Sequence, residues 1–283
     1  MRLLSWNIQS GRGMDGRVDL NRILADIDAM GGFDVIALQE VAVGFHGLPG
    51  GQGEDQVAIL AAGLPSHTPI FACATDLPGP NGRRKQFGNA LFSRFPVLQV
   101  FRHLLPWPSD PGVPSMQRVM LEAVLDTGTD PIRMTTTHLE YYSATQRMAQ
   151  IDAIRRLHRE ACAHARRPRT GEGESDGPFA VLPRPASTIL CGDMNFPAEA
   201  SDRKRLLAPF DTNEPIYLDA WERLHPSTEH APTVGIHKVY WVDRPVCFDY
   251  FFLSEDLLPR LQSIGVNAVT SASDHQPVWI ELD

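Results

Sequence analysis

Apolar runs of strand length alternate with helix-like segments along this chain, and this alternation limits the folds open to it. Strands are expected at residues 2–8, 33–39, 70–74, 89–92, 118–125, 132–137, 187–191, 248–253 and 277–282. Three helices are expected between them, at residues 20–30, 54–62 and 143–165. Strands and helices that alternate in this way are typical of an α/β or a layered α+β fold.

Capping residues support the expected helix boundaries. Asp19 is a candidate N-cap for the first helix, which the glycines at 31–32 stop, and Gly63 is a candidate C-cap for the second. The third helix has the strongest signal, because Ser143 and Gln146 have the spacing of a capping box. Its apolar face is expected to consist of Met148, Ile151, Ile154 and Leu157.

The length of the chain, 283 residues, is ordinary for one α/β domain, and we expect residues 1–283 to form a single domain. Residues 166–186 are rich in Gly, Pro and charge, which predicts a mobile surface loop rather than a domain linker. Residues 226–246 form a second long irregular stretch. Long loops in a compact domain often carry binding residues.

Composition narrows the class of protein. The hydrophobic share of 43% and the charged share of 21% exclude a disordered chain, a coiled coil and a collagen-like fibre. The formal net charge is −8, whereas proteins that coat long stretches of nucleic acid are usually basic. An acidic balance still allows a small cleft that binds one phosphate around a cation.

The cysteines and the N-terminus bear on the compartment. Cys73, Cys162, Cys191 and Cys247 form no CxxC pair, which favours free buried thiols in a reducing compartment. The first apolar run is too short for a signal peptide, and no window approaches the ~20 apolar residues of a membrane-spanning helix. We therefore expect a cytoplasmic protein with no membrane span and no obligate protein partner.

Polar side chains lie where the expected strands end or begin. In chain order they are Asn7, Glu40, His138, Asp193, Asn195, Asp249, Asp274 and His275. Each short motif that contains one or two of these residues is weak evidence alone, since an Asp-x-Asn sequence is typical of a turn. Six such motifs in this order are hard to assemble by chance. Strand ends are where open α/β sheets hold their sites, and these oxygen-rich groups suit Mg²⁺ or Mn²⁺ better than Zn²⁺.

Six motifs together resemble one known family. They are LSWNIQ at 4–9, IALQEV at 36–41, GNALFSRFP at 88–96, THL at 137–139, GDMN at 192–195 and SDH at 273–275. The resemblance is to the endonuclease/exonuclease/phosphatase family, which includes pancreatic-type deoxyribonuclease, apurinic endonucleases, neutral sphingomyelinases and inositol polyphosphate 5-phosphatases. It implies a four-layer α/β sandwich, two packed mixed β-sheets flanked by helices, and Mg²⁺-dependent phosphoester hydrolysis. It does not identify the substrate.

The resemblance also implies roles for the residues near the metal. Asn7 and Glu40 hold the metal, Glu40 most directly, and Asp274 lies near it. Asp193 orients or deprotonates the attacking water. Asn195 binds the scissile phosphate and fixes Asp193.

Two imidazoles are implied on the phosphate side of the site. His275 contacts a phosphate oxygen and has Asp249 as its carboxylate partner, and His138 is the second imidazole. A carboxylate-backed imidazole holds its proton more strongly, so the resemblance is consistent with a cationic His275 near neutral pH. The positive charge of His275 would lie beside the phosphoryl oxygens, whose negative charge must be neutralised during phosphoester hydrolysis.

Other residues are candidates for substrate binding. Arg118 either binds phosphate, as the resemblance implies, or forms a surface salt bridge. Asp76 is a candidate carboxylate partner of His138, and Asn89 either faces the cleft or lies at a strand edge. The aromatic stretch 239–242 either stacks on a base, sugar or lipid group or packs over the sheet.

Some features depart from the family pattern. Gln9 stands where apurinic-type nucleases carry an acid, which counts against a second metal site. The basic run 83–85 is the best candidate for extra phosphate contacts, although such runs are usually solvated. The histidines outside the motifs, such as His46, His67, His103, His225, His230 and His237, are expected to be structural or solvated.

Three functions follow, in order of preference. The first is a metal-dependent phosphodiesterase or nuclease acting on DNA or RNA, which predicts steep inhibition by salt. The second is a phosphatase or phosphodiesterase for a small or lipid-linked phosphate, such as an inositol phosphate or a phospholipid head group. The third is a non-catalytic binding module, against which the complete set of motifs argues.

Overall fold

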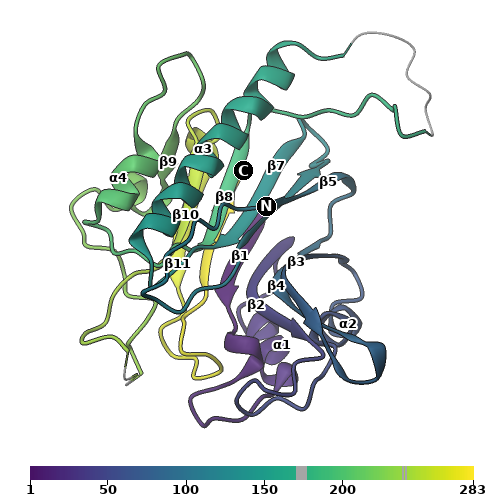
Figure 1. Cartoon of the computed structure of the whole chain (residues 1–283). Coiled ribbons are helices and arrows are strands. Elements are labelled where there is room, and N and C mark those ends of the chain that lie inside the picture. The colour runs from purple at the N-terminus through teal and green to yellow at the C-terminus, as the bar shows by residue number, and fades with distance from the viewer. Residues whose placement is uncertain (170–176, 238, 240) are drawn as a thin grey trace.

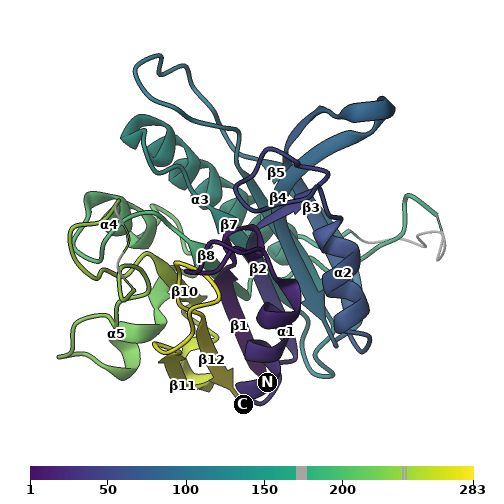
Figure 2. The same ribbon diagram turned by 90° about the horizontal axis from the view of Figure 1, so that it is seen from below.

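The fold is a pair of six-stranded β-sheets with helices on their outer faces (Figures 1 and 2). The computed structural model describes residues 1–169, 177–237, 239 and 241–283. Residues 170–176, inside the predicted loop 166–186, lie outside this description, as does Tyr240 of the aromatic stretch.

The first sheet contains both ends of the chain. Its strands are β1 (Arg2–Asn7), β2 (Val35–Val43), β3 (Thr68–Pro78), β4 (Arg84–Ser93), β11 (Leu261–Val266) and β12 (Val278–Leu282). Their order across the sheet is β11-β12-β1-β2-β4-β3. Only β1 and β2 are parallel among these neighbours, so the sheet is mixed.

The second sheet repeats this plan. Its strands are β5 (Val97–Leu104), β6 (Val119–Leu125), β7 (Ile132–His138), β8 (Thr188–Asp193), β9 (Tyr217–Asp219) and β10 (Asp249–Ser254). Their order is β5-β6-β7-β8-β10-β9, and β7 and β8 form its parallel pair. Each sheet therefore has one parallel pair at its centre.

Alternation along the strands builds the layers. Leu3 and Val35 of the first sheet share a buried cluster with Leu121, Met134 and Phe251 of the second, so the inward faces pack together. Their strand neighbours point outward, because successive side chains alternate between the faces of a sheet. Each large apolar side chain buried in this way contributes about 1.5–3 kcal/mol.

Helices cover the two outer faces. The helices are α1 (Leu20–Ala29), α2 (Gln56–Gly63), α3 (Ala144–Arg166), α4 (Ser201–Leu207) and α5 (Ala220–Leu224), and short 3₁₀ turns lie at η1 (Gln9–Gly11), η2 (Pro80–Gly82) and η3 (Leu258–Arg260). Ile23 of α1 and Leu60 of α2 pack on the first sheet, and Ile151 of α3 and Leu206 of α4 pack on the second. Helix, sheet, sheet and helix form the expected four layers.

Capping contacts begin α1 and α3 where the sequence predicts, whereas α2 begins after an Asp55 cap and ends with Leu64, not Gly63, as its C-cap. The Asp19 side chain accepts hydrogen bonds from the backbone N–H groups of Asn21 and Arg22 at the start of α1. Ser143 accepts one from the N–H of Gln146 at the start of α3. These caps satisfy donors that have no partner within the helix.

Some elements are longer than predicted, or were not predicted. β2 continues past Gln39 to Val43, so Glu40 lies inside the strand instead of at its end. β5, β9, β11, α4 and α5 have no counterpart among the expected elements. β5 and β11 are edge strands with mostly half-buried residues, and the others are short, so none gives a clear periodic signal.

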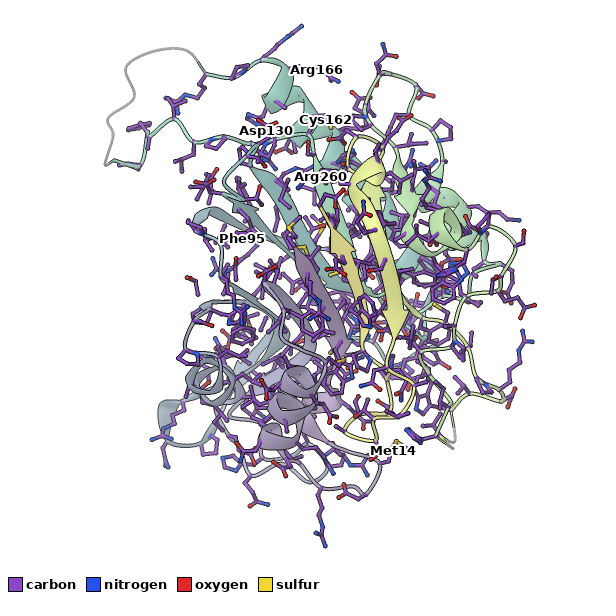
Figure 3. All side chains as sticks on the ribbon, turned by 180° about the vertical axis from the view of Figure 1, so that it is seen from behind. Met14, Phe95, Asp130, Cys162, Arg166 and Arg260 are labelled. Atoms are coloured by element: carbon purple, nitrogen blue, oxygen red, sulfur yellow. The ribbon has the colours of Figure 1, made fainter. Side chains whose placement is uncertain are left out.

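The parallel pairs determine where polar side chains gather. The carboxyl ends of β1, β2, β7 and β8 point to the same end of the sandwich, and the two sheets meet through β1, β2, β7 and β8. Met14, labelled in Figure 3, lies toward this end, and Asp130 lies toward the other.

All four cysteines are free; Cys162, Cys191 and Cys247 are buried and Cys73 is half-buried. Among the described residues, none of the helices has the length and apolar character needed to cross a bilayer.

Candidate active site

An irregularity in β2 places the Glu40 side chain at the end of the sandwich. The pairing of β2 with β4 shifts register between Leu38 and Val41, and Glu40 has a positive φ of 58°. Positive φ is uncommon for a residue with a β-carbon, and such strain is typical of functional positions. The bulge leaves the Glu40 side chain 25% exposed while its strand neighbours are buried.

Asn7 joins Glu40 to a second carboxylate across the two sheets. Its Nδ2 donates to Glu40 Oε1 at 3.1 Å and to Asp193 Oδ2 at 3.0 Å. Its Oδ1 accepts from the backbone N–H of Gln9 at 3.0 Å. Asn7 therefore fixes the relative position of two carboxylates that come from different sheets.

Asp193 ends β8 directly after a glycine that permits close strand pairing. Gly192 has φ 134°, and a β-carbon there would lie 1.9 Å from the carbonyl oxygen of Thr137 on β7. Asp193 is 1% exposed, and its Oδ1 accepts from the backbone N–H of Asn195 at 3.0 Å. The Asn195 side chain donates to the Leu139 carbonyl at 2.8 Å. Asn195 therefore holds Asp193 through its backbone.

His275 lies between two carboxylates. Its Nδ1 is 2.9 Å from Asp249 Oδ2, and its Nε2 is 3.6 Å from Asp193 Oδ2. The Thr233 hydroxyl donates to the same Asp249 oxygen at 2.6 Å and accepts from the backbone N–H groups of Phe248 and Asp249. The expected pairing of Asp249 with His275 is present in the geometry.

His138 reaches the same oxygen of Asp193 from the end of β7. Its Nε2 lies 3.3 Å from Asp193 Oδ2, and its Nδ1 lies 3.9 Å from Glu40 Oε1. Arg118 lines the same small pocket as His138 and is buried. Two of its nitrogens are 3.3 Å from Glu140 Oε2, while its Nη1 has no hydrogen-bond partner within the described part of the chain.

The surroundings of these groups shift their pKa values in different directions. Burial raises the pKa of Asp193 above its usual range, although the neighbouring His275 opposes the shift. Burial acts against protonation of His275, but Asp249 and Asp193 outweigh it and raise the pKa of the imidazole. Burial, then the nearby Arg118, keep the pKa of His138 well below its ordinary value. These shifts favour a protonated His275 and a neutral His138.

Asp274, the third residue predicted near the metal, also lies near Glu40. Burial and then the charge of Asp274 raise the pKa of Glu40, so these two carboxylates repel each other. Asp274 is 7% exposed, and its Oδ2 accepts from Gln9 Nε2 at 2.8 Å. Gln9 thus supplies a hydrogen-bond donor where apurinic-type relatives carry an acid.

Of the predicted substrate-binding residues, Asn89 lies beside His138 and Asp76 lies away from it. Asn89 is 3% exposed and lines the pocket of His138 and Arg118, but its Nδ2 donates to the Val119 carbonyl at 2.9 Å. The predicted pairing of Asp76 with His138 is wrong. Asp76 extends along the β3–β4 hairpin beyond the site, where it accepts from Arg84 at 2.6 Å and Gln86 at 3.1 Å.

Sequence reasoning missed three supporting residues. Thr233 orients Asp249, Glu140 holds Arg118, and the buried Gln39 donates to Thr136 Oγ1 at 2.8 Å beneath the site. Gln39 and Glu140 stand next to or near motif residues, so proximity in sequence was an available signal. Thr233 lies in the irregular stretch 226–246, where the sequence gives no comparable signal.

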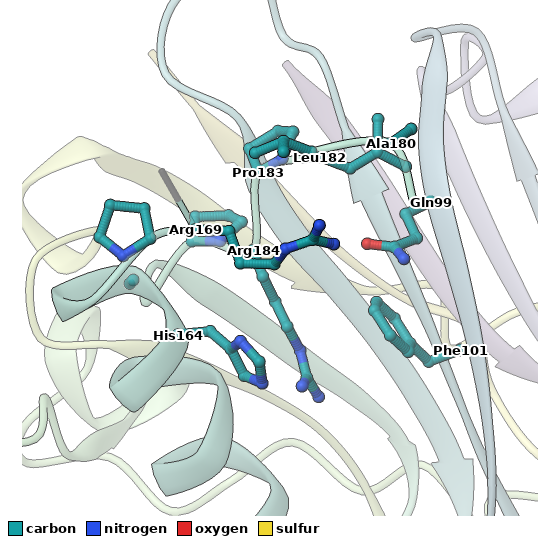
Figure 4. A pocket seen from close by; sticks show the side chains of 12 residues that line it. Gln99, Phe101, His164, Arg169, Ala180, Leu182, Pro183 and Arg184 are labelled. Carbon is teal, nitrogen blue, oxygen red and sulfur yellow. The ribbon is translucent and has the colours of Figure 1, made fainter. Parts of the chain in front are cut away.

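A cavity of about 500 Å³ lies at the opposite end of the sandwich (Figure 4). Its walls include Phe101 of β5, His164 near the end of α3, and Arg184. Arg184 is already paired with Glu160 at 2.8 Å and lies over the Phe101 ring at 4.5 Å. The cavity contains none of the predicted site residues, and its charged wall is partly neutralised.

Comparisons with known proteins agree with this arrangement. The sequence profile described as Endonuclease/Exonuclease/phosphatase family matches residues 4–275. The fold and the convergent carboxylates, amide and imidazoles thus define a family of phosphoester-hydrolase type, and the chain belongs to the endonuclease/exonuclease/phosphatase family. Members of this family are generally hydrolases that act on phosphoesters.

Solved structures show the same fold at low sequence identity. The endonuclease/exonuclease/phosphatase from Beutenbergia cavernae is 23% identical, with a TM-score of 0.66 over 99% of this chain and 70% of that one. A mannosyl-6-phosphatase from Bacteroides thetaiotaomicron is 16% identical, with a TM-score of 0.68 over 100% and 99%. Truncated TDP2 from Caenorhabditis elegans is 17% identical, with a TM-score of 0.61 over 99% and 95%. No curated protein sequence gives a match.

Proposed function

We propose that this protein is a Mg²⁺- or Mn²⁺-dependent phosphoester hydrolase that cleaves phosphodiesters. One observation carries the proposal: nitrogen atoms of three residues from separate strands and loops surround a single oxygen, Asp193 Oδ2, which accepts a hydrogen bond from Asn7. Asn7 Nδ2 lies 3.0 Å from it, His138 Nε2 3.3 Å and His275 Nε2 3.6 Å. Such a group is positioned to hold a water molecule beside a phosphate.

The residues at Glu40 fit a hard divalent cation. Glu40, Asp274 and the oxygen of Asn7 are the ligand types that Mg²⁺ and Mn²⁺ prefer. The raised pKa of Glu40, caused first by burial and then by Asp274, marks a negative site that a cation would stabilise. When bound there, the ion would polarise a phosphoryl oxygen and stabilise charge on the leaving oxygen.

A second group of possible ligands is less suitable for a cation. Ligand atoms of Asp193, Asp249 and His275 lie within 4.8 Å of one another. However, His275 Nδ1 is within hydrogen-bond distance of Asp249, and the raised pKa favours the protonated ring. A protonated imidazole repels a metal ion, so we assign the cation to Glu40 and these three residues to proton and phosphate binding.

Asp193 is the proposed base. Burial brings its pKa toward neutrality, which suits a group that must take a proton from water during attack. The backbone N–H of Asn195 and the amide of Asn7 hold its two oxygens, so its orientation does not depend on substrate. Pre-organised groups of this kind lower the barrier because they need no rearrangement during the reaction.

The two imidazoles have separate proposed roles. His275, positively charged and backed by Asp249, donates to a non-bridging phosphate oxygen. His138, whose lowered pKa favours the neutral ring, lies with its Nε2 3.3 Å from Asp193 Oδ2 and supports the orientation of that carboxylate. Because the site residues run from Asn7 to His275 and come from both sheets, we propose that residues 1–283 act as one domain.

Phosphomonoester hydrolysis is the second candidate function. Arg118 Nη1 is buried beside His138 without a hydrogen-bond partner among the described residues. A monoester dianion carries more charge than a diester, and a guanidinium N–H that has no other partner can stabilise it. This observation keeps a phosphatase as the alternative.

The experiment compares hydrolysis of bis(p-nitrophenyl) phosphate and p-nitrophenyl phosphate with Mg²⁺, Mn²⁺ or EDTA. We expect metal-dependent cleavage of the diester, and a loss of about 10²–10⁴-fold in kcat for Asp193→Asn, the scale of general-base catalysis. Asp152→Asn, which changes an exposed carboxylate on α3, is the matched control. Full activity of Asp193→Asn or full activity in EDTA would contradict the proposal. Cleavage of the monoester alone would move the assignment to a phosphatase.

Cation binding is tested separately by thermal unfolding. A ligand that binds only the folded state raises the melting temperature. We expect Mg²⁺ to raise the Tm of the wild-type protein and to have little effect on Glu40→Gln, which retains a polar side chain of equal size. An equal Mg²⁺ shift in both proteins would remove Glu40 from the metal site.

A further inference from the structure

Aromatic side chains stand directly beside His275, at the edge of the candidate active site. The ring of Trp241 lies 5.9 Å from the His275 ring, with an angle of 27° between their planes. Tyr141 packs edge-on against Trp241 at 5.6 Å, and Tyr142 packs edge-on against Tyr141 at 4.9 Å. We call Tyr141, Tyr142 and Trp241 the aromatic rim.

The aromatic rim is held in place by hydrogen bonds from several elements. The Tyr141 hydroxyl donates to the Trp241 carbonyl at 3.2 Å, which joins the β7–α3 loop to the irregular stretch 226–246. Arg147 donates to the Tyr141 carbonyl at 2.9 Å, and Glu140 accepts from the Tyr142 N–H at 2.9 Å. The backbone that carries the three rings, and the Tyr141 ring itself, are therefore held before any ligand arrives, which lowers the entropic cost of binding.

Packing alone does not account for the rim. Phe248 fills the space beneath it, 6.3 Å from both Trp241 and Tyr141, and is 7% exposed. By contrast, Tyr142 is 60% exposed and Trp241 is 38% exposed. Exposed aromatic rings grouped beside a polar cleft are typical of ligand-binding surfaces.

The position of the rim restricts what it can contact. Trp241 packs on the same imidazole that we assign to a non-bridging phosphate oxygen. A group that contacts the rim while its phosphate contacts His275 must therefore belong to a substituent carried by that phosphate. Planar unsaturated rings gain most from such a surface, because they stack on aromatic side chains.

We propose that the aromatic rim is a subsite for a planar aromatic ring linked to the scissile phosphate, and that it makes this enzyme selective for aryl or nucleoside phosphoesters over saturated ones. The inference rests on the proposed function, since it places the phosphate at His275. It goes further by assigning the substrate's neighbouring group to Tyr142 and Trp241.

Binding of non-hydrolysable ligands tests the subsite without relying on turnover. Phenylphosphonate and cyclohexylphosphonate have similar size but differ in planarity, and methylphosphonate lacks a ring. Dissociation constants are measured by calorimetry with Mg²⁺ present. We expect phenylphosphonate to bind about tenfold more tightly than cyclohexylphosphonate, within the range of ring stacking on aromatic side chains.

Variants assign the preference to the rim. Trp241→Ala and Tyr142→Ala are expected to weaken phenylphosphonate binding about tenfold and to leave methylphosphonate binding within about twofold. Trp241→Phe should retain most of the preference. Phe179→Ala removes an exposed aromatic side chain outside the rim and should change nothing.

The possible results distinguish failure of the aromatic subsite from failure of the proposed hydrolase function. Equal affinity for the phenyl and cyclohexyl ligands in the wild-type protein would overturn the subsite, and so would an equal loss of methylphosphonate binding in Trp241→Ala. Absence of phosphoester hydrolysis with a retained phenyl preference would instead overturn the proposed function alone. A second pair, adenosine 5′-monophosphate against ribose 5-phosphate, identifies a nucleobase as the ring if the base improves affinity, and an aryl group if it does not.

Discussion

At the scale of single residues, three buried histidines show how surroundings determine protonation. His275 lies between carboxylates and is charged, whereas His138 lies beside Arg118 and is neutral. His158 of α3, like His138, has its pKa lowered first by burial and then by a nearby arginine. Arg133 donates to its Nδ1 at 2.8 Å, so Nδ1 carries no proton, and its Nε2–H donates to the Pro215 carbonyl at 2.7 Å.

His158 predicts a pH dependence of stability. Burial, then Arg133, lower the pKa of His158 to about 4. Between its usual value of 6.5 and about 4, the unfolded chain binds a proton that the folded chain does not, so stability falls as pH falls through this window. The contribution is about 1.4 kcal/mol per pH unit.

The measurement is the free energy of unfolding in urea at pH 7 and pH 5. His158→Gln should be less stable at pH 7, because it loses at least one buried hydrogen bond, but its loss on acidification should be smaller than in the wild-type protein. His164→Gln changes an exposed histidine on the same helix and should behave like wild type. An unchanged pH dependence in His158→Gln would refute the assignment.

At the scale of elements, each sheet contributes one central parallel pair, and the site forms where the two pairs end. The strands can approach closely only where side chains allow it. Gly192 shows this limit, because a β-carbon there would lie 1.9 Å from the Thr137 carbonyl oxygen. The next residue, Asp193, is the proposed base, so strand pairing and site geometry depend on the same contact.

Gly192→Ala is expected to reduce both stability and activity. The clash with backbone and the strained φ should together lower the free energy of unfolding by about 2 kcal/mol or more. Diester hydrolysis should fall as well, because Asp193 moves with β8. The comparison is Gly128→Ala, which has a similarly positive φ of 80° but nothing within 4 Å of the added β-carbon. Equal losses of stability in the two variants would mean that the positive φ, and not the contact with β7, causes the loss.

At the scale of the whole molecule, charge bears on the size of the substrate. The chain has a net charge of −8, and its best candidate patch for extra phosphate contacts, residues 83–85, lies on the β3–β4 hairpin. Arg84 of that patch is already paired with Asp76 at 2.6 Å, and Lys85 lies over the Phe45 ring at 5.5 Å. Two of the three basic residues of the patch thus have partners already, and we infer a small phosphoester as substrate rather than a long nucleic acid.

We therefore expect weak dependence of substrate binding on salt. A protein that contacts six to ten DNA phosphates loses about 10³–10⁵ in affinity between 50 and 200 mM salt. The inhibition constant of a short DNA duplex, measured against diester hydrolysis, should change by less than about tenfold over this range. A thousandfold change would instead support the nuclease expected first from the sequence.

Local sequence signals predicted much of the fold. The caps Asp19 and Ser143 begin α1 and α3 as expected, and the central strands appear near the predicted residues, because their apolar runs are long and buried. Edge strands such as β5 and short elements such as α5 were not predicted, since half-exposed or brief segments carry little periodicity. The bulge that places Glu40 inside β2 depends on pairing with β4, a contact between distant segments.

The sequence by itself determined the α/β class and the candidate set from Asn7 to His275, and its motifs determined the family, whose resemblance implied the four-layer fold, because strand-end chemistry and short motifs are local properties. The roles of these residues remain predictions. Only the tertiary structure decided which groups meet: it brought Asp249 to His275, moved Asp76 away from His138, and placed Thr233 and the aromatic rim at the site. The reason is physical, because contacts between segments far apart in the chain depend on how the two sheets pack and on loops without periodic patterns.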